Sequence, residues 1–566
     1  MKLAIMVASA LFFLVSHLLV AQTDQGPAPP PFSRADTLRG MLTPLRACYD
    51  VRYYHLDVRV DPATQSISGS TTIRFTALTA LDRMQIDLFR NMKIAKITLD
   101  GGAALEFSRE FDAVFVQMPG TLGPNTTHEL VFHYSGNPVV AKRPPWEGGF
   151  TWTHDSSGSP WVVVTCQGTG ASLWWPNKDH QSDEPDSMLI SVTVPPGLED
   201  VSNGRLRAAM ELADGWTRFD WFVSAPVNNY NVTVNIGKYA HISDTFVSAD
   251  TVTLDYFVLP ENLEKARFHF RQVKPMMAAF EKYFGPYPFR RDGYKLVECP
   301  HTGMEHQSAV AYGNRYLGGY RGRASSDVGL KFDFIIIHES AHEWWGNSVT
   351  ANDVADMWIH ESFGAYAEAL FVEFVYGRTE SLRYINAKKK NVSNKQPIVG
   401  VFNVNHEGSG DMYDKGQLVL NTFRSVLDND SLWFSLLRGI AETFRHRTVD
   451  GNDIVRFING KTGKEYTYFF DQYLKYPKIP QLDVMAVKKG DTVSVRYRWR
   501  TDVQDFRMPV KVAIPGRPLE LITPTTSWQT MTLGGFRPED FGLAEDLFYV
   551  DLKLNWVYLD PGLPGR

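Results

Sequence analysis

Polar and apolar residues alternate in short runs along the first part of the chain. Residues 55–60 (HLDVRV) and 72–75 (TIRF) carry an apolar side chain at every second position, and the turn sequence DPAT lies between them. This period is typical of strands with one buried face. Similar runs continue to about residue 240, for example at residues 231–236. The pattern predicts an antiparallel β-domain over residues 46–240.

The next part of the chain has apolar residues three and four positions apart, which is the spacing of amphipathic helices. It predicts a mostly helical domain over residues 241–480. The segments with this spacing are residues 261–284, 331–346, 362–376, 416–427 and 453–461. Alternation returns at residues 492–499 (TVSVRYRW), which predicts a small β-domain over residues 481–566. The fold class expected is therefore multidomain α+β, as a chain of 566 residues is too long for one core.

The N-terminus has a different character. Lys2 is followed by an apolar run from residue 3 to residue 20, and Ala21 precedes a polar stretch. We expect a secretory signal peptide over residues 1–21, with an uncleaved anchor as the alternative. A proline-rich extended linker is expected over residues 22–45. The chain would then be exported, to a periplasm or outside the cell, without a stable membrane anchor after cleavage.

Composition narrows the possible partners. Apolar residues make up 44% and charged residues 21% of the chain, which is typical of a folded protein. The formal net charge is −5 and no long basic run occurs, so nucleic acid is not an expected partner. The three cysteines Cys48, Cys166 and Cys299 are too few for a disulfide framework. One disulfide or three buried thiols both remain open.

The segment HESAHEWWG, which begins at His338, carries the chemistry. His338 and His342 lie one helical turn apart on the same face, so both imidazoles can reach one ion. A catalytic zinc needs a third protein ligand and an open position for water. Glu361, early in the following predicted helix, can supply that ligand. The pattern predicts one zinc ion per chain.

Two further carboxylates belong to the same pair of predicted helices. Glu339 points away from the histidine face, toward the open coordination position. There it can act as a general base that takes a proton from an activated water. The alternative is an ordinary surface glutamate. Glu368 lies two helical turns after Glu361 and could accept a proton from a ligand histidine, or simply lie on the helix surface.

At this point the sequence resembles the aminopeptidase N-like gluzincin family of zinc metallopeptidases, which also contains the leukotriene epoxide hydrolase. The resemblance covers about residues 48–480. Its motifs occur in the family's order and are YDV at residues 49–51 with YHLD at 54–57, GMEH at 303–306, HESAHEWW at 338–345 with Glu361, and YDKG at 413–416. The resemblance implies a thermolysin-like catalytic domain.

The resemblance also implies how substrate is bound. The segment of Gly303, Met304 and Glu305 matches the family's exopeptidase motif, in which the glutamate binds the free α-amine of the substrate. His306 stands where the family commonly has asparagine. Gln167 resembles a residue of the first domain that also touches the α-amine.

Tyr413 matches the tyrosine whose phenol stabilises the oxyanion. Many relatives end in a helical domain that closes over the site. The last β-region of this sequence resembles their intermediate immunoglobulin-like β-sandwich domain, so a more open cleft is expected. The predicted function is zinc-dependent removal of N-terminal residues from peptides with a free N-terminus. The alternatives are a zinc endopeptidase, an epoxide hydrolase on the same fold, or a non-catalytic binding protein.

Overall fold

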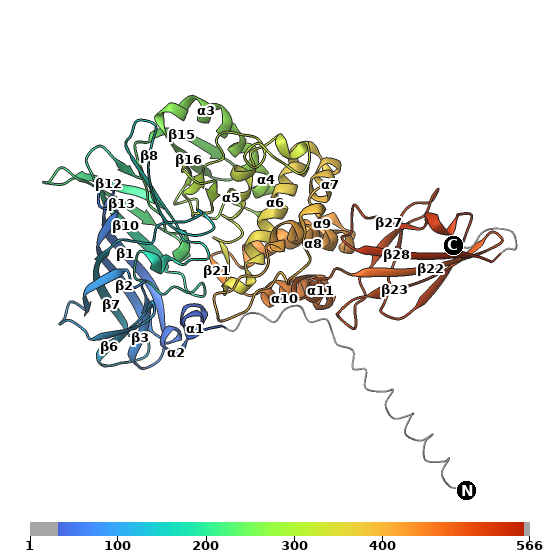
Figure 1. The fold of residues 1–566 in the computed structure, drawn as a ribbon, viewed down its shortest axis with the longest axis horizontal. Coiled ribbons are helices and arrows are strands. Elements are labelled where there is room, and N and C mark those ends of the chain that lie inside the picture. The colour runs from blue at the N-terminus through green and yellow to red at the C-terminus, as the bar shows by residue number, and fades with distance from the viewer. Residues whose placement is uncertain (1–31, 560–566) are drawn as a thin grey trace, which may run out of the picture. The chain divides into compact units, whose positions relative to one another are not determined.

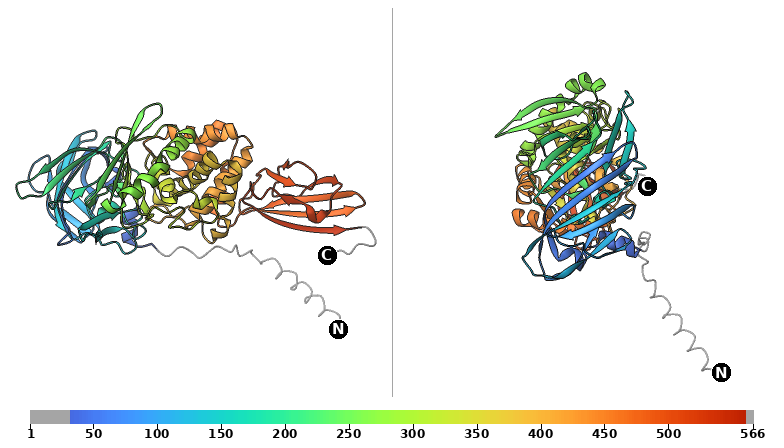
Figure 2. Two further views of the ribbon diagram at one scale, coloured as in Figure 1. Left: turned by 90° about the horizontal axis from the view of Figure 1, so that it is seen from above. Right: turned by 90° about the vertical axis from the view of Figure 1, so that its left-hand side faces the viewer.

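A seven-stranded sheet forms the centre of the first part of the molecule, in the order β12-β13-β10-β1-β2-β7-β4. The structure, a computed structural model, describes residues 32–559. The sheet's strands lie side by side in Figure 2. They are β1 (Tyr49–Asp61), β2 (Ser66–Ala77), β4 (Met92–Leu99), β7 (Thr127–Gly136), β10 (Ser187–Val194), β12 (Arg205–Glu211) and β13 (Thr217–Val223). All neighbouring pairs are antiparallel except β1 and β10, which run parallel.

Two smaller sheets complete this β-region. One has the order β3-β6-β5 and the other β11-β14-β9-β8. Their strands are β3 (Leu81–Asp87), β5 (Phe107–Glu110), β6 (Ala113–Leu122), β8 (Gly149–His154), β9 (Pro160–Thr165), β11 (Glu199–Asp200) and β14 (Asn235–Gly237). The buried apolar side chains of the three sheets form one core, as the alternation along β1 and β2 predicts.

The strand expected at residues 231–236 is mostly absent. Only its end is a strand, β14, and Asn229–Asn231 forms a 3₁₀ turn instead. The side chain of Asn228 accepts a hydrogen bond from the backbone of Tyr230 and starts this turn. Local side-chain hydrogen bonding by asparagine competes with strand pairing here.

The extended linker expected over residues 22–45 contains helices in its described part. Helix α1 spans Arg34–Gly40 and α2 spans Pro44–Ala47. Arg39 donates hydrogen bonds to the carbonyls of Gly168 and Thr169, which fastens α1 to the loop after β9. This contact between distant segments leaves no periodic signal in the local sequence. The predicted signal peptide at residues 1–21 lies outside the described residues.

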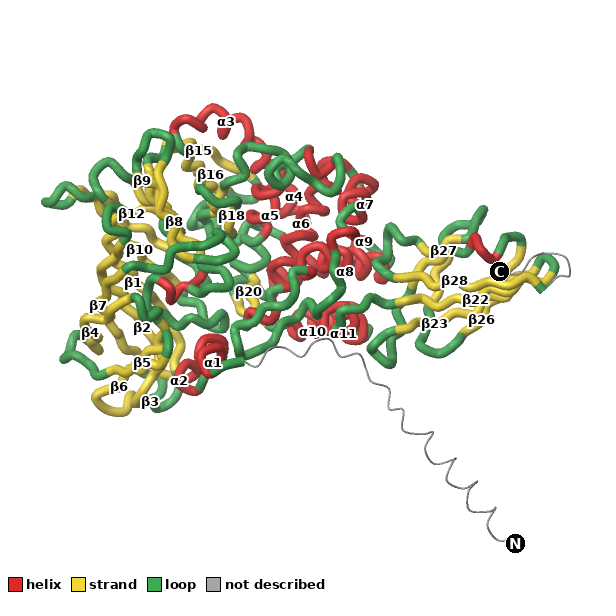
Figure 3. Tube along the Cα trace, in the orientation of Figure 1, coloured by secondary structure: helices red, strands yellow, loops and turns green. Residues whose placement is uncertain are grey.

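The part of the chain that follows combines a mixed sheet with helices, which are red in Figure 3. The sheet has the order β15-β16-β17-β19-β18. Its strands are β15 (Ala240–Val247), β16 (Thr251–Val258), β17 (Tyr294–Glu298), β18 (Gly303–Met304) and β19 (Val310–Tyr312). The helices are α3 (Leu263–His269), α4 (Val273–Phe284), α5 (Phe334–Ala341), α6 (Trp358–Tyr376), α7 (Arg378–Asn386), α8 (Asp411–Leu427), α9 (Asp430–Thr443), α10 (Gly451–Thr462) and α11 (Thr467–Lys475). Each helical segment expected from the sequence contains a helix.

Two short strands, β20 (Val349–Ala351) and β21 (Arg447–Val449), pair parallel within this helical part. The chain then forms two last sheets, of order β26-β23-β22-β28 and β25-β24-β27. Their strands are β22 (Gln481–Lys489), β23 (Thr492–Arg500), β24 (Val510–Ala513), β25 (Glu520–Ile522), β26 (Gln529–Gly534), β27 (Gly542–Leu543) and β28 (Asp551–Tyr558). Their buried side chains continue the apolar core of the helical part. Figure 1 shows the elements in chain order.

The described chain from Arg34 onward forms one compact unit. The fold class is multidomain α+β, with an N-terminal β-domain. The boundaries expected at residues 240 and 480 stay predictions. Within residues 32–559, no helix combines the length and the apolar character needed to cross a bilayer.

Candidate zinc site and substrate cavity

Helix α5 carries the two histidines in a buried position. Asp333 caps its N-terminus by accepting hydrogen bonds from the backbone N–H groups of Ile335 (2.9 Å) and Ile336 (3.3 Å). The isoleucines of the first turn are buried, as their unbroken apolar run suggests. His338 lies in the helix and His342 is its C-cap residue, still with helical backbone angles.

Helix α6 brings the third residue to the same place. It packs against α5, and Glu361 lies in its first turn. Gly364 allows the close approach, because a Cβ there would lie 3.0 Å from Cε1 of His342. A larger residue would push the two helices apart.

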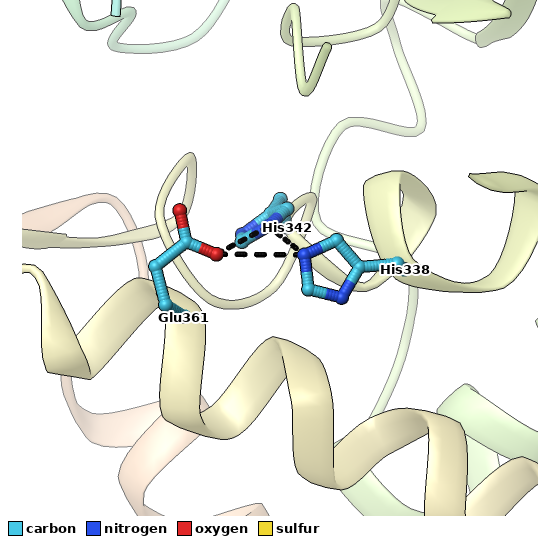
Figure 4. Close-up of side chains that lie close together, drawn as sticks. All are labelled: His338, His342 and Glu361. Atoms are coloured by element: carbon cyan, nitrogen blue, oxygen red, sulfur yellow. Dashed lines mark hydrogen bonds and ion pairs between the residues drawn. The ribbon is translucent and has the colours of Figure 1, made fainter. Parts of the chain in front are cut away.

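Three donor atoms converge between these helices (Figure 4). Oε2 of Glu361 lies 3.4 Å from Nε2 of His338 and 3.4 Å from Nε2 of His342. The two Nε2 atoms are 3.3 Å apart. Ligand atoms that bind one tetrahedral zinc at about 2.0–2.1 Å lie about 3.3 Å from one another, so this donor set fits one zinc ion.

The other nitrogen of each histidine is already engaged. Nδ1 of His338 lies 2.7 Å from Oε1 of Glu368, and Nδ1 of His342 lies 2.8 Å from the carbonyl oxygen of Trp345. Both contacts require a proton on Nδ1, which leaves the two Nε2 lone pairs for a metal. The contact between Glu368 and a histidine, one of two readings of the sequence, is present.

Glu339 faces the cavity beside these donors. Its carboxylate packs against Gly303, where a Cβ would lie 2.8 Å from Oε1 of Glu339. Burial raises the pKa of Glu339 to about 7. A carboxylate with a pKa near neutrality can both accept and return a proton.

Glu305 contacts side chains from two distant parts of the chain, the loop of Gln167 and the turn of Tyr230. Its Oε1 accepts a hydrogen bond from Nε2 of Gln167 (2.8 Å) and another from the phenol of Tyr230 (3.1 Å). Gln167 also donates to Oε1 of Glu361 at 3.0 Å. Burial raises the pKa of the Glu305 carboxyl above its usual range. Tyr230 was not predicted from the sequence, because the NNYN segment around it has no periodicity or motif that indicates a site.

Tyr413 lies in the first turn of α8, where it faces His338. The two ring centroids are 5.9 Å apart. Helix α8 packs closely on α6, since a Cβ on Gly416 would lie 2.1 Å from Oγ of Ser362, and that Oγ donates to the carbonyl of Met412 (2.8 Å). Burial raises the pKa of Tyr413 well above its usual value, so the phenol keeps its proton and can donate a hydrogen bond.

His306 is buried, and neither ring nitrogen has a hydrogen-bond partner among the described residues. Asn347 donates from its side chain to the carbonyl of Glu305 at 2.9 Å. This amide fixes the backbone beside His306.

The cysteines Cys48, Cys166 and Cys299 are all buried and form no disulfide, which resolves the open choice in favour of three thiols.

One cavity of about 290 Å³ brings the predicted residues together. Every residue selected from the sequence for metal, catalysis or substrate binding lines it. They are Gln167, Gly303, Met304, Glu305, His338, Glu339, His342, Glu361 and Tyr413.

Comparison with known protein families gives a match to the helical part of the chain. Residues 268–473 match the Peptidase family M1 domain. The comparisons support an aminopeptidase N-like M1 family for this part of the chain. The match to this domain and the three converging donors together indicate one zinc ion as the cofactor.

The sequence identity to individual relatives is low. It is 21% identical over 403 residues to endoplasmic reticulum aminopeptidase 1 of Homo sapiens, across 67% of this chain and 42% of the human protein. It is 26% identical over 224 residues to glutamyl aminopeptidase of Homo sapiens, across 39% of this chain and 23% of that protein. It thus spans less than half the length of these relatives.

A solved structure shares the fold. It is a mutant of an M1 zinc metallopeptidase from Deinococcus radiodurans bound to a Tyr-Ser-Ala substrate, with a TM-score of 0.63 and 21% identity. The match covers 77% of this chain and 96% of that one.

Proposed function

We propose that this chain is a zinc aminopeptidase that removes N-terminal residues from peptides. The observation that carries the proposal is the cavity in which Glu305, with its two hydrogen-bond donors, lies beside the three converging donor atoms. A buried carboxylate that lines a cavity is a natural partner for an ammonium group. It holds the substrate's N-terminus at a fixed distance from the reacting bond.

His338, His342 and Glu361 would hold the zinc ion, which when bound supplies a Lewis acid that activates water and polarises the scissile carbonyl. Glu305, with Gln167 beside it, holds the substrate's α-ammonium. Glu339 takes the proton from the attacking water and later gives it to the leaving amine.

Tyr413 has a separate role in this proposal. Its phenol donates a hydrogen bond to the oxygen that becomes negatively charged in the tetrahedral intermediate. Its retained proton and its place facing His338 across the cavity support this role. Gly303 and Met304 line the same cavity, where both would contact the substrate.

A panel of fluorogenic aminoacyl substrates tests the proposal, each with a free and with an acetylated N-terminus. We expect turnover of the free forms, loss of turnover on chelation, and recovery on addition of one equivalent of zinc. Equal cleavage of capped and free substrates would contradict the exopeptidase assignment and favour an endopeptidase. Opening of an epoxide without any peptidase activity would favour the epoxide hydrolase.

We propose also that the chain is exported after removal of residues 1–21. Lys2, the apolar run that follows it and the small residue Ala21 support this. N-terminal sequencing of the secreted or periplasmic protein should give Gln22 as the first residue. Recovery of the protein with its full N-terminus in the membrane fraction would instead indicate an anchor.

A further inference from the structure

Trp146 is a large apolar side chain that lies open to solvent at the substrate cavity. Its residue is 62% exposed and it lines the cavity together with Pro145. It occupies a tight turn between β7 and β8. The turn is closed by the backbone hydrogen bond from Glu147 to the carbonyl of Arg143 (3.0 Å) and by an ion pair between these two side chains. An exposed tryptophan in a closed turn beside a cavity is a candidate ligand contact.

The turn is fastened to the loop that carries Gln167. The backbone N–H of Gly148 donates to Oγ1 of Thr169 at 3.1 Å. Thr169 belongs to the same loop as Gln167, whose side-chain amide bonds Glu305 at 2.8 Å. Trp146 is therefore connected, through one loop, to the residue that would hold the ammonium. The side chain next to that ammonium belongs to the first residue of the substrate.

The cavity offers an acidic side chain no lysine or arginine partner. Three carboxylates line it, those of Glu305, Glu339 and Glu361, and no lysine or arginine of residues 32–559 does. Its apolar lining consists of Pro145, Trp146, Met304, Tyr320, Phe334 and Ile335. A carboxylate side chain placed against Trp146 and Met304 would lose its hydration without gaining a lysine or arginine partner.

Cations occur on the other side of Tyr413. A neighbouring cavity shares Tyr320, Phe334 and Tyr413 with the first, but not Glu305 or Trp146. Arg323 and Lys388 line this second cavity together with Glu368 and Asp414, and the ammonium of Lys388 is paired with Glu368 at 2.6 Å. Arg323 is the cation left for a substrate among the described residues that line the two cavities.

We propose that Trp146 and Met304 receive the side chain of the substrate's first residue, that this site selects bulky apolar residues, and that it rejects acidic ones. The proposal rests on the proposed aminopeptidase function. One relative bears the name glutamyl aminopeptidase, and the cavity described here lacks the cation that such a preference would need.

The first test compares kcat/KM for Phe, Leu, Ala and Glu aminoacyl reporters. We expect Phe and Leu to exceed Glu by at least about 100-fold, since burial without a lysine or arginine partner opposes the acidic side chain. Exchange of Trp146 for Ala should lower the ratio of Phe to Ala turnover about 10-fold, the scale of a lost apolar contact. Trp528→Ala, a partly exposed tryptophan on the C-terminal β-region, is the matched control and should leave the ratio unchanged. A preference for Glu, or an unchanged ratio in Trp146→Ala, would overturn the proposal.

Order of residues provides a second test. Peptides that begin Leu-Glu should be cleaved and those that begin Glu-Leu should not, because Arg323 lines the second cavity and not the one that holds Glu305 and Trp146. Equal cleavage of both would overturn the proposal.

A binding measurement separates this proposal from the proposed function. Titration calorimetry of the zinc-loaded protein with L-phenylalanine and with L-glutamate needs no turnover. We expect L-phenylalanine to bind at least about 10-fold more tightly, and Trp146→Ala to remove most of this difference. Absence of peptidase activity with this binding preference intact would refute the function alone. Equal binding of the two amino acids would refute the side-chain site alone.

Discussion

Glu368 accepts a hydrogen bond from Nδ1 of His338 at 2.7 Å, from one helix to the next. The other oxygen of the same carboxylate accepts from the ammonium of Lys388 (2.6 Å) and from the phenol of Tyr384 (2.5 Å). All of these groups are buried. Lys388 and Tyr384 therefore hold the carboxylate of Glu368 in place, and Glu368 in turn orients the ring of His338. This fixes the direction of the Nε2 lone pair of His338.

Replacement of Glu368 by Ala should weaken zinc binding about 10- to 100-fold, because the ring of His338 loses the partner that orients it. Competition with a chromophoric chelator measures the dissociation constant. Glu380→Ala, on the solvent-exposed side of α7 and paired with Arg383, is the control and should bind zinc as the parent does. Unchanged zinc affinity in Glu368→Ala would show that the hydrogen bond has no role in metal binding.

Replacement of Glu339 by Gln should leave zinc bound and reduce kcat about 10²- to 10⁴-fold, the usual contribution of a general base. The amide has nearly the same shape but cannot accept the proton of water. Metal analysis of the purified variant and steady-state kinetics with a free-amine reporter give the two quantities. Turnover at the parent rate with zinc present would remove Glu339 from the mechanism.

Replacement of Glu305 by Ala should raise KM for free-amine substrates and lower kcat/KM by at least about 100-fold, since the α-ammonium loses its buried counter-charge. The preference for free over acetylated substrates should shrink by the same factor. Zinc content should not change, because Glu305 is not one of the converging donors. A preserved preference would place amine recognition elsewhere.

Replacement of Tyr413 by Phe should reduce kcat about 10²- to 10³-fold with little change in KM, as expected for a donor that acts mainly in the transition state. Tyr476→Phe, at a partly exposed tyrosine beyond α11, is the control. A change confined to KM would instead indicate that the phenol binds the ground state of the substrate.

Asp200, on β11, makes folding stability depend on pH. Burial raises its pKa to about 8, and its Oδ1 has no hydrogen-bond partner among the described residues, while Oδ2 accepts from Ser202 at 2.9 Å. A carboxyl whose pKa is raised on folding contributes stability below its unfolded value of about 3.9, and this is lost as pH rises through about 8.

Between the unfolded and the folded pKa of Asp200, the free energy of unfolding should fall as pH rises, and this residue should contribute up to about 1.4 kcal/mol per pH unit to the fall. Asp200→Asn mimics the protonated form and should remove that slope. Urea unfolding at pH 6 and pH 8 for the parent, Asp200→Asn and the exposed control Asp82→Asn measures the difference. Identical slopes in all three proteins would contradict the assignment.

Periodicity predicted the helices and most strands because each element buries one face. The strands at residues 55–60 and 72–75 lie within β1 and β2, and the segment around His338 is a buried helix. It was wrong at residues 231–236, where buried asparagines form hydrogen bonds that an apolar count does not register. The extended linker expected from the proline-rich composition was wrong for residues 34–40, where α1 is held by a loop far away in sequence.

The sequence by itself determined the metal chemistry. Two histidines one turn apart and a glutamate at the start of the next helix converge once both helices bury their apolar faces, because helix geometry fixes where the side chains point. The contacts of Tyr230 with Glu305 and of Gly148 with Thr169, and hence the place of Trp146 at the cavity, were decided only by tertiary structure. Each joins segments far apart in the chain, and their distance depends on how the packed sheets and helices meet, which no local pattern encodes.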